Sequence, residues 1–449
     1  MNKNEAFCNL STYLTNSIID LILIVTYHSK MAIPRDSINI LILNSEYSRK
    51  WEENHPDLIR RSEVWKKYVY SELVAWNANT LKEFLPKLGY DAHKIHEMSM
   101  CLENYVEEIE KLKLMNKKNL VVFNLCNGAD EEDGWLGPSV PRQLEKADLP
   151  FTGASYEFYA ATVAKLVMKE RLQNAGVRTP EFLAMKKVTP EEIKEVIEKV
   201  GFPMLTKVAW GYDSIGIVNN SVIWNYKEAH EKIPDMFRRF SEIYMERFII
   251  GREFTVFIVD VVDGTGLGEN GVTRKNGRAY KVFPAMERIF PEDVPEELRF
   301  VREDHEYVGA DEFVASSKKE AIYSIRNVSE QLNYALTALA LDAYLACGGR
   351  SYGRVDIRED SRTTTITPTT STTSTTTHER NYSQGNSEQH SEGSGEDAHR
   401  NGNFYVLEVN SQPCISLDCR TPFAETIKLQ PNFLYVLDTI IQHTLASAH

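Results

Sequence analysis

Two short charged segments near the C-terminus constrain the fold of this chain most strongly. They are Gly353–Arg358 (GRVDIR) and Phe404–Asn410 (FYVLEVN). Side chains alternate between the two faces of a β-strand, so the charged residues of each segment share one face. These residues are Arg354 and Asp356 in the first segment and Glu408 and Asn410 in the second. If the segments pair as a hairpin, one surface gathers a cation, two carboxylates and an amide.

The oxygen atoms of this surface suit Mg²⁺, a hard ion that takes oxygen ligands and bridges substrate phosphates. The arginine would then face phosphoryl oxygens. The alternative interpretation is a ladder of surface ion pairs across two strands. The apolar residues Val355, Leu407 and Val409 are expected to bury the opposite face. This favours a charged face that is directed at a specific ligand.

Length and composition narrow the class of protein. A chain of 449 residues suits two or three domains, and a formal net charge of −13 argues against a general nucleic-acid or membrane-surface binder. Six scattered cysteines without a CxxC pair predict a reduced, cytoplasmic protein. The apolar stretch at 17–27 is interrupted by Asp20 and is too short to span a membrane. Residues 1–36 are expected to be an N-terminal extension outside the fold.

Apolar runs along the chain predict the order of elements. Buried strands are expected at 38–44 and 120–125 with a helix around 62–88 between them, an order typical of an α/β domain with a parallel sheet. Later helices are expected at 156–175, from Thr189-Pro190 onward, and at 329–347, and later strands at 201–207, 243–249 and 253–262. The Thr/Ser-rich segment 361–403 has almost no apolar residues, which predicts a disordered insertion at the hairpin tip.

Several further residues suggest phosphate binding, although each is a weak signal alone. Lys165 lies in the predicted helix 156–175, and Lys207 precedes the glycine loop 211–216, whose backbone N–H groups could cradle a phosphate. Two acidic residues, Glu246 and Glu253, flank a bend at Gly251. Taken singly, such residues are more often solvated than functional.

In this order, together with the two charged segments, these motifs resemble the ATP-grasp superfamily and, within it, the D-alanine–D-alanine ligases. The resemblance runs from about Leu120 to the C-terminus and includes Leu149–Gly153 (LPFTG) and Phe202-Pro203. It implies an α/β preATP-grasp domain with a parallel sheet at 37–155. A two-lobed α+β ATP-grasp fold would follow, with a central lobe at 156–245 and a C-terminal lobe at 246–449.

The resemblance also assigns roles by position. Lys165 and Lys207 would bind the phosphates of ATP, and a flexible loop with Gly211, Ser214 and Gly216 would close over them. At the hinge, Glu246 and the backbone of Arg247 to Ile249 would contact the adenine. Glu253 would hold the ribose hydroxyls. Asp356, Glu408 and Asn410 would hold one or two Mg²⁺ ions, which Mn²⁺ could replace. Arg354 would be the catalytic residue that stabilises charge during phosphoryl transfer. A further cation would be either Lys281 or Arg288.

The implied activity is that of an ATP- and Mg²⁺-dependent carboxylate–amine ligase. It would form an amide or dipeptide through an acylphosphate and release ADP and phosphate. Its small carboxylate and amine substrates would be amino acids, and a homodimer is expected, with no nucleic-acid or membrane partner.

The chain departs from the family pattern mainly at the positions that would bind the amino-acid substrates. Glu46 follows the first strand without the family's glycines, Cys414 stands where the family has glycine, and Cys419 stands where it often has serine. Asp213 replaces a serine in the phosphate loop.

Two other functions therefore stay open. The first is a regulatory protein that binds ATP through an ATP-grasp fold but does not ligate. The second is an ATP-grasp kinase that phosphorylates a small molecule. The presence of Arg354, whose implied role is in the transition state, favours the ligase.

Overall fold

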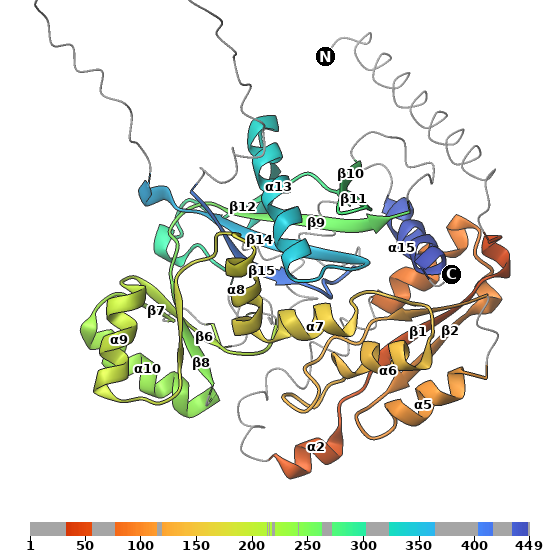
Figure 1. The fold of residues 1–449 in the computed structure, drawn as a ribbon, viewed down its shortest axis with the longest axis horizontal. Helices are drawn as coiled ribbons and strands as arrows, with labels where there is room; N and C mark the ends of the chain where they lie inside the picture. Colours follow the sequence, from red (N-terminus) through yellow and green to blue (C-terminus); the bar gives the residue numbers. More distant parts are fainter. Residues whose placement is uncertain are drawn as a thin grey trace, which may run out of the picture.

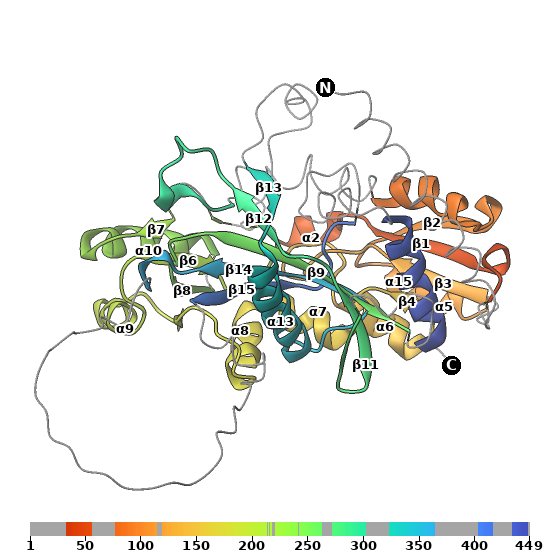
Figure 2. The ribbon, with the colours of Figure 1, turned by 90° about the horizontal axis from the view of Figure 1, so that it is seen from above.

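The computed structural model describes residues 33–55, 77–114, 119–212, 214, 216–217, 221–240, 242–262, 272–301, 323–363, 403–415 and 433–447, and every structural statement below concerns these residues. Three β-sheets form its framework. A long central sheet lies between an N-terminal domain at one end and a small lobe carrying α9 and α10 at the other (Figure 1, Figure 2).

The N-terminal sheet is parallel, as predicted. Its strand order is β2 (Ile95–Met100), β1 (Asn39–Ser45), β3 (Leu120–Asn124) and β4 (Phe151–Thr152). Strands β1 and β3 are continuous apolar runs because both faces of the sheet are covered. One face packs against the helical segment 77–84 and α15 (Phe433–Ser447), and the other against α5 (Tyr105–Leu112) and α6 (Ser139–Ala147).

The small lobe is an antiparallel sheet backed by two helices. Its strands are β5 (Phe182–Met185), β8 (Ile243–Arg247), β6 (Met204–Val208) and β7 (Val222–Ile223), in that spatial order. Helices α9 (Pro190–Val200) and α10 (Tyr226–Phe240) bury their apolar stripes against it. The predicted start of α9 is confirmed, since the Thr189 side chain accepts a hydrogen bond from the N–H of Glu192 at 3.2 Å.

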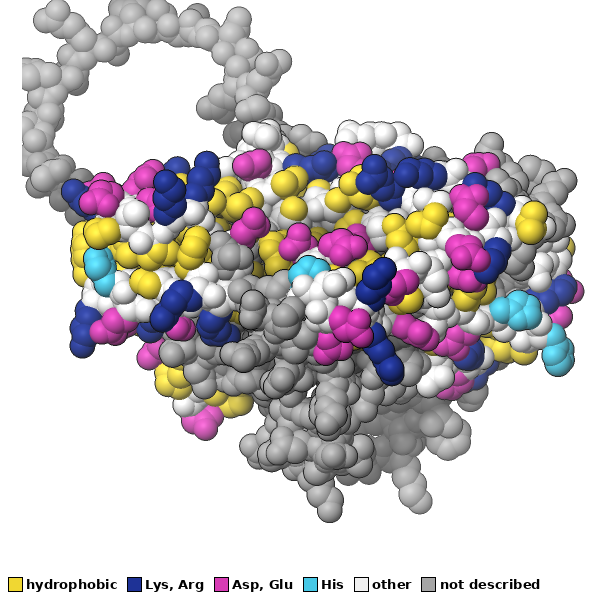
Figure 3. Space-filling view, turned by 90° about the horizontal axis from the view of Figure 1, so that it is seen from below, with side chains coloured by type: hydrophobic (Ala, Val, Ile, Leu, Met, Phe, Trp, Pro, Cys, Tyr) yellow, Lys and Arg dark blue, Asp and Glu magenta, His cyan; other side chains and the backbone are white. Residues whose placement is uncertain are grey.

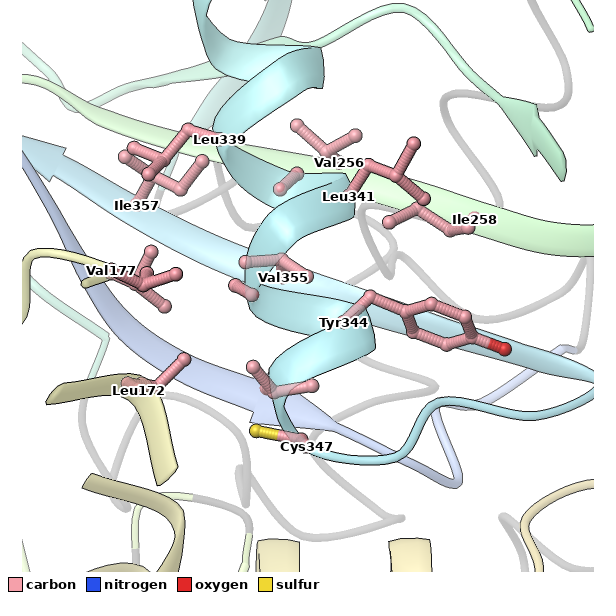
Figure 4. Close-up of a cluster of buried hydrophobic side chains, with 14 of the residues drawn as sticks. Leu172, Val177, Val256, Ile258, Leu339, Leu341, Tyr344, Cys347, Val355 and Ile357 are labelled. Carbon is pink, nitrogen blue, oxygen red and sulfur yellow. The ribbon is translucent and has the colours of Figure 1, made fainter. Parts of the chain in front are cut away.

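The central sheet is built around the long strand β9 (Glu253–Val261). Strands β11 (Arg278–Val282) and β12 (Met286–Ile289) pair along one edge of β9, and β14 (Tyr352–Glu359) pairs along the other. Strands β10 (Val272–Lys275), β13 (Ser324–Asn327) and β15 (Phe404–Asn410) extend it. Helix α13 (Glu330–Ala346) crosses one face, where its apolar side chains meet those of β9 and β14 (Figure 4). The opposite face carries Glu253 and Asp356, together with Phe257, Val259 and Tyr352, which pack in the core of the N-terminal domain.

Strands β14 and β15 form the predicted antiparallel pair, with one difference. Asp356 lies opposite Glu408 and Arg354 opposite Asn410, but the register shifts so that Ile357 lies opposite Val406. Leu407 is therefore the extra residue of a β-bulge. Its predicted burial beside Val409 is wrong, because Leu407 is only half-buried and Val406 fills the core instead.

The helix predicted over 156–175 is two helices, α7 (Tyr156–Val163) and α8 (Lys165–Asn174). Ala164 leaves the helical conformation with ψ of 88° and forms a β-bridge with Trp210, while the N–H of Lys165 donates to Ala209 O at 2.9 Å. This pairing with a distant segment breaks the helix, which no local sequence signal indicates.

Several predicted boundaries also change. Ile33 packs on the N-terminal core and Arg35 pairs with Asp438, so the folded body begins before residue 37. A helix was expected at 62–88, and within this range the structure describes a helix at residues 77–84. Of the insertion expected at 361–403, residues 364–402 lie outside the described residues. The remaining short helices are α2 (Arg49–Asn54) and the 3₁₀ turns η2 (Arg35–Ser37), η3 (Pro86–Leu88), η4 (Ala92–Lys94), η6 (Glu296–Leu298) and η7 (Ser361–Thr363). Within the described part of the chain, no helix is both long and apolar enough to cross a membrane.

The buried carboxylate of Asp438 ties α15 to the N-terminal sheet. Arg35 donates to it through Nε at 2.8 Å and through a terminal guanidinium nitrogen at 2.6 Å, and the Tyr90 hydroxyl donates at 2.8 Å. We expect Asp438→Asn to lower the free energy of unfolding by about 3 kcal/mol, because it breaks a buried ion pair and leaves Arg35 uncompensated. Urea unfolding measures the change.

The matched control is Asp235→Asn, which removes an exposed ion pair with Arg238. Its expected effect is within about 0.5 kcal/mol. Equal effects of the two substitutions would show that the Asp438 cluster does not hold α15 in place.

Candidate functional site

The polar face of the central sheet carries a dense set of charges. Its members come from four adjacent strands: Arg288 on β12, Glu253 on β9, Arg354, Asp356 and Arg358 on β14, and Glu408 and Asn410 on β15. They share a face because the alternate residues of β9, β14 and β15 lie in the core beneath α13. The predicted gathering of the metal-ligand set and Arg354 is thus observed.

Asp356 is the centre of this set. Its Oδ2 accepts from Arg354 at 3.0 Å and from the Asn410 amide at 3.1 Å, and its Oδ1 lies 3.5 Å from Arg288. Burial alone would raise the pKa of Asp356, but Arg354 and Arg288 more than offset this, so the pKa is lowered. Asp356 is therefore an ionised carboxylate at neutral pH.

The structure separates the two candidates for the additional cation. Arg288 contacts Glu253 and lies beside Asp356, so it belongs to the charged face. Lys281 lies on β11 opposite Val259, and burial lowers its pKa. The side chain that meets the predicted site residues is therefore Arg288.

Two lysines reach the site from elements outside the central sheet. Lys165, at the start of α8, contacts the carboxylate of Glu408, and Lys207 on β6 contacts Glu246 on β8 at 2.7 Å. Both lysines are thus paired with predicted site carboxylates. An incoming polyphosphate would compete with these carboxylates for the lysines, and Glu408 would then be released toward a cation.

A third lysine, Lys169, was not predicted. It lies one turn after Lys165 on α8, its side chain is 0% exposed, and it forms an ion pair with Glu246. Glu246 is thus held between two ammonium groups, which offset the effect of burial and lower its pKa. The spacing of four residues from Lys165, which places both side chains on one helix face, was the available sequence signal.

The segment predicted to be the hinge, at the end of β8, makes several contacts of its own. The Arg247 guanidinium contacts Glu181 and Asp360 and stacks 4.7 Å over the ring of Tyr405. The N–H of Arg247 donates to Glu181 O at 2.8 Å, and that of Phe248 donates to Pro203 O at 2.9 Å. A nucleotide base at this hinge would therefore use other groups of the predicted segment, such as those of Ile249.

The glycine loop begins beside Lys165. The N–H of Gly211 donates to Val163 O at 3.1 Å, next to the break between α7 and α8. Ser214 has a left-handed φ of 54°, and Gly216, with φ of 77°, packs so closely on α10 that an added Cβ would lie 2.6 Å from Met236. Of the predicted loop residues, Gly211 thus lies next to the first lysine and Gly216 lies on α10, whereas Asp213 lies outside the described residues.

The same loop is docked on the N-terminal domain through Tyr212. Its ring packs in a cluster with Ala129 and Trp135, and its hydroxyl donates to Oδ2 of Asp133. The other oxygen of Asp133 accepts from the N–H groups of Ala129 and Trp135, each at 3.0 Å. Burial raises the pKa of Asp133 to about 7, even though these hydrogen bonds lower it. This contact between distant segments was not predicted.

On the amino-acid side, the departures from the family pattern have clear positions. Glu46 is exposed at the end of β1, and Cys414 donates its thiol to Asn77 Oδ1 at 3.3 Å. Gln412 lies against Gly153, where φ is 88° and an added Cβ would lie 2.6 Å from the amide oxygen. Cys419 lies outside the described residues. In Figure 3, acidic side chains gather along the middle of the face seen from below.

The chemistry of the donor set fits a hard cation. Oδ1 of Asp356 is buried and accepts no hydrogen bond from any described residue, and Arg288 lies 3.5 Å from it. In the described part of the chain, no three His, Cys, Asp or Glu side chains form a metal-binding group. A metal here would therefore need the amide oxygen of Asn410 beside Asp356 and Glu408, a donor set suited to Mg²⁺.

Comparisons with known proteins agree with this fold. The family model described as D-ala D-ala ligase C-terminus matches residues 172–282. A D-alanine–D-alanine ligase A from Bacillus cereus is 29% identical over 153 residues, which are 34% of this chain and 48% of that ligase, so the match spans about half of that relative. A D-alanine–D-alanine ligase from Actinobacillus pleuropneumoniae is 24% identical over 279 residues, 62% of this chain and 76% of that protein.

Solved structures extend the similarity over most of the chain. The ATP complex of a D-alanine–D-alanine ligase from Bacillus anthracis has a TM-score of 0.54 at 17% identity and covers 92% of this chain and 98% of that one. The VanG D-Ala:D-Ser ligase from Enterococcus faecalis has a TM-score of 0.55 at 14% identity, with coverage of 91% and 99%. The predicted resemblance and fold class are thereby confirmed.

The Asp133–Tyr212 contact predicts a dependence of stability on pH. Because the pKa of Asp133 is raised, the folded chain binds more protons than the unfolded chain between about pH 4 and pH 7. The contribution of this group to stability is greatest at low pH and is lost as the pH rises through 7. Asp133→Asn removes this dependence. The difference in unfolding free energy, variant minus parent, should therefore rise by at least about 1 kcal/mol as the pH is raised from 4 to 7.

Urea titrations at several pH values measure this difference. Glu83→Gln, which alters an exposed carboxylate paired with Lys87, is the control and should give a constant offset. A constant offset for Asp133→Asn as well would mean that its carboxyl titrates normally in the folded chain.

Proposed function

We propose that this chain, which has the fold of the D-alanine–D-alanine ligases, is an ATP- and Mg²⁺-dependent carboxylate–amine ligase that joins two amino acids. The carboxylate of one substrate would take the γ-phosphoryl group of ATP to give an acylphosphate. The amine of the second would displace phosphate and form the amide, and ADP would be released. The protein would act in the cytoplasm and would form a homodimer, as expected from the sequence.

One observation carries the proposal: cations from three parts of the fold lie beside the carboxylates of the site, in the pattern that phosphoryl transfer needs. Lys165 comes from α8, Lys207 from the small sheet, and Arg288 and Arg354 from the central sheet. Such cations stabilise the charge that develops on a transferred phosphoryl group. The oxygen donors of Asp356, Glu408 and Asn410 lie among these cations. Their presence favours the binding of a metal-bound nucleotide over a simple ladder of ion pairs.

The side chains of the protein would mainly position and screen the reactants. Lys165 and Lys207 would leave Glu408 and Glu246 in part and bind the phosphates. Arg354 is held by Asp356, and the attraction of that carboxylate keeps its guanidinium charged in spite of burial, so the pKa of Arg354 is raised. Bound Mg²⁺ would supply charge neutralisation between the phosphates and the carboxylates. No nucleophilic side chain is needed, because the substrate carboxylate attacks.

The choice of amino-acid substrates would depend on the segment around Cys414. Printed names of the relatives refer to D-alanine and D-serine, yet this chain has Cys414 at the position where the resemblance expects glycine. The β-carbon of Cys414 restricts the backbone conformation at this position. In the family, backbone N–H groups of this loop are expected to stabilise the tetrahedral intermediate. The engagement of Cys414 with Asn77 is the observation that favours the second candidate, a nucleotide-binding protein that does not ligate.

The first experiment measures ADP release from Mg²⁺-ATP with D- and L-amino acids, singly and in pairs, and identifies the product by mass spectrometry. We expect stimulation by a particular pair together with an amide product. Asp356→Asn or Glu408→Gln should lower kcat by about a hundredfold or more, because each removes charge from the metal and phosphate site.

Asp342→Asn, which alters a half-buried carboxylate on α13 that pairs with Lys275, is the matched control and should be neutral. Unchanged turnover in Asp356→Asn would contradict the ligase assignment. Tight ATP binding without stimulation by any pair would favour the non-ligating protein, and ADP formation without an amide would favour the small-molecule kinase.

A further inference from the structure

Lys169 is a fully buried cation to which the proposed mechanism assigns no role. Its ammonium group contacts the Glu246 carboxylate, donates to Thr179 Oγ1 at 2.8 Å and donates to Leu407 O at 2.9 Å. A lysine ammonium carries three donors, so these contacts account for all of them. Burial lowers the pKa of Lys169 to about 8, although Glu246 opposes this shift, and the group is charged at neutral pH.

The contact with the Leu407 carbonyl lies at the β-bulge, and this bulge determines which face of the sheet carries the proposed metal ligands. Phe404 and Val406 lie in the core, so simple alternation would turn Glu408 and Asn410 into the core as well. The extra residue at Leu407 reverses the alternation, so that Val409 takes the next core position. The bulge thus places Glu408 and Asn410 on the polar face.

Lys169 holds this bulge through the carbonyl of the bulged residue itself. The neighbouring segment adds two contacts along the same edge of β15: Thr179 donates to Val406 O at 2.9 Å, and the N–H of Val406 donates to Arg178 O at 2.8 Å. Because Lys169 also donates to Thr179, it joins both parts of this support.

The same ammonium group also reaches the other lobe. Glu246 belongs to β8 of the small sheet, whereas Leu407 belongs to β15 of the central sheet. One turn earlier on α8, Lys165 contacts Glu408, the residue directly after the bulge. Helix α8 therefore presents two cations on one face, and Lys169 joins the hinge carboxylate to the strand of the proposed metal ligands.

We propose that Lys169 is a positioning residue of the nucleotide site: it fixes the bulge at Leu407, and thereby the directions of Glu408 and Asn410, while it holds Glu246 of the opposite lobe. The functional part of this inference rests on the proposed ATP- and Mg²⁺-dependent activity. The positional part concerns the unliganded chain.

The test compares Lys169→Met/Glu246→Gln with Glu246→Gln alone. Both variants lack the Glu246 charge, so their difference reports the removal of the Lys169 ammonium group together with its contacts to Leu407 and Thr179. Hydrogen exchange of the unliganded chain should be faster in the segment 404–410 of the double variant. The Mg²⁺ concentration that half-saturates ATP binding should rise about tenfold, as for other residues that orient metal ligands.

Lys232→Met is the matched control, because Lys232 also donates to a backbone carbonyl, at 2.8 Å, and pairs with a carboxylate on α10. It should change neither readout. If the double variant behaves like Glu246→Gln in both measurements, Lys169 only neutralises Glu246 and the inference is wrong. If exchange increases but even the parent chain binds no Mg²⁺-ATP, the proposed function fails while the positioning role stands.

Discussion

The requirement that every buried charge between the lobes be neutralised governs the geometry of this structure. Glu246 is 2% exposed and sits between Lys169 and Lys207, while Asp356 sits between Arg354 and Arg288. An unpaired charge at either position would cost several kcal/mol, so the partners cannot drift apart without loss of stability. The pairs that connect the two sheets run through α8, because Lys169 pairs with Glu246 of the small sheet and Lys165 pairs with Glu408 of the central sheet.

The local patterns that the sequence reveals are those that depend on near neighbours. Alternation within GRVDIR identified which side chains of β14 share a face, and the Thr189-Pro190 signal located the start of α9 correctly. Continuous apolar runs predicted β1 and β3 because both faces of that sheet are buried. Each of these features is set by periodicity or by capping within a few residues.

The features that the sequence did not reveal arise from contacts between distant segments. Ala164 interrupts a good helical pattern only because Trp210 pairs with it, and Leu407 is extruded only because Val406 and Val409 must both reach the core. Arg288 and Lys281 are equivalent as isolated residues, and their surroundings in the sheet separate them. The contact of Tyr212 with Asp133 belongs to the same class, since it joins residues of two domains.

The end of the β14–β15 hairpin is closed by the backbone itself. The N–H of Asp360 donates to the carbonyl of Asn403 at 2.8 Å, so the chain leaves the sheet and returns to it at one point. The length of chain between these two residues therefore does not enter the geometry of the charged face, since loop closure costs little more for a long connection than for a short one. A shorter connection between Asp360 and Asn403 would therefore keep the pairing of β14 with β15, and with it the face that carries Asp356 and Glu408.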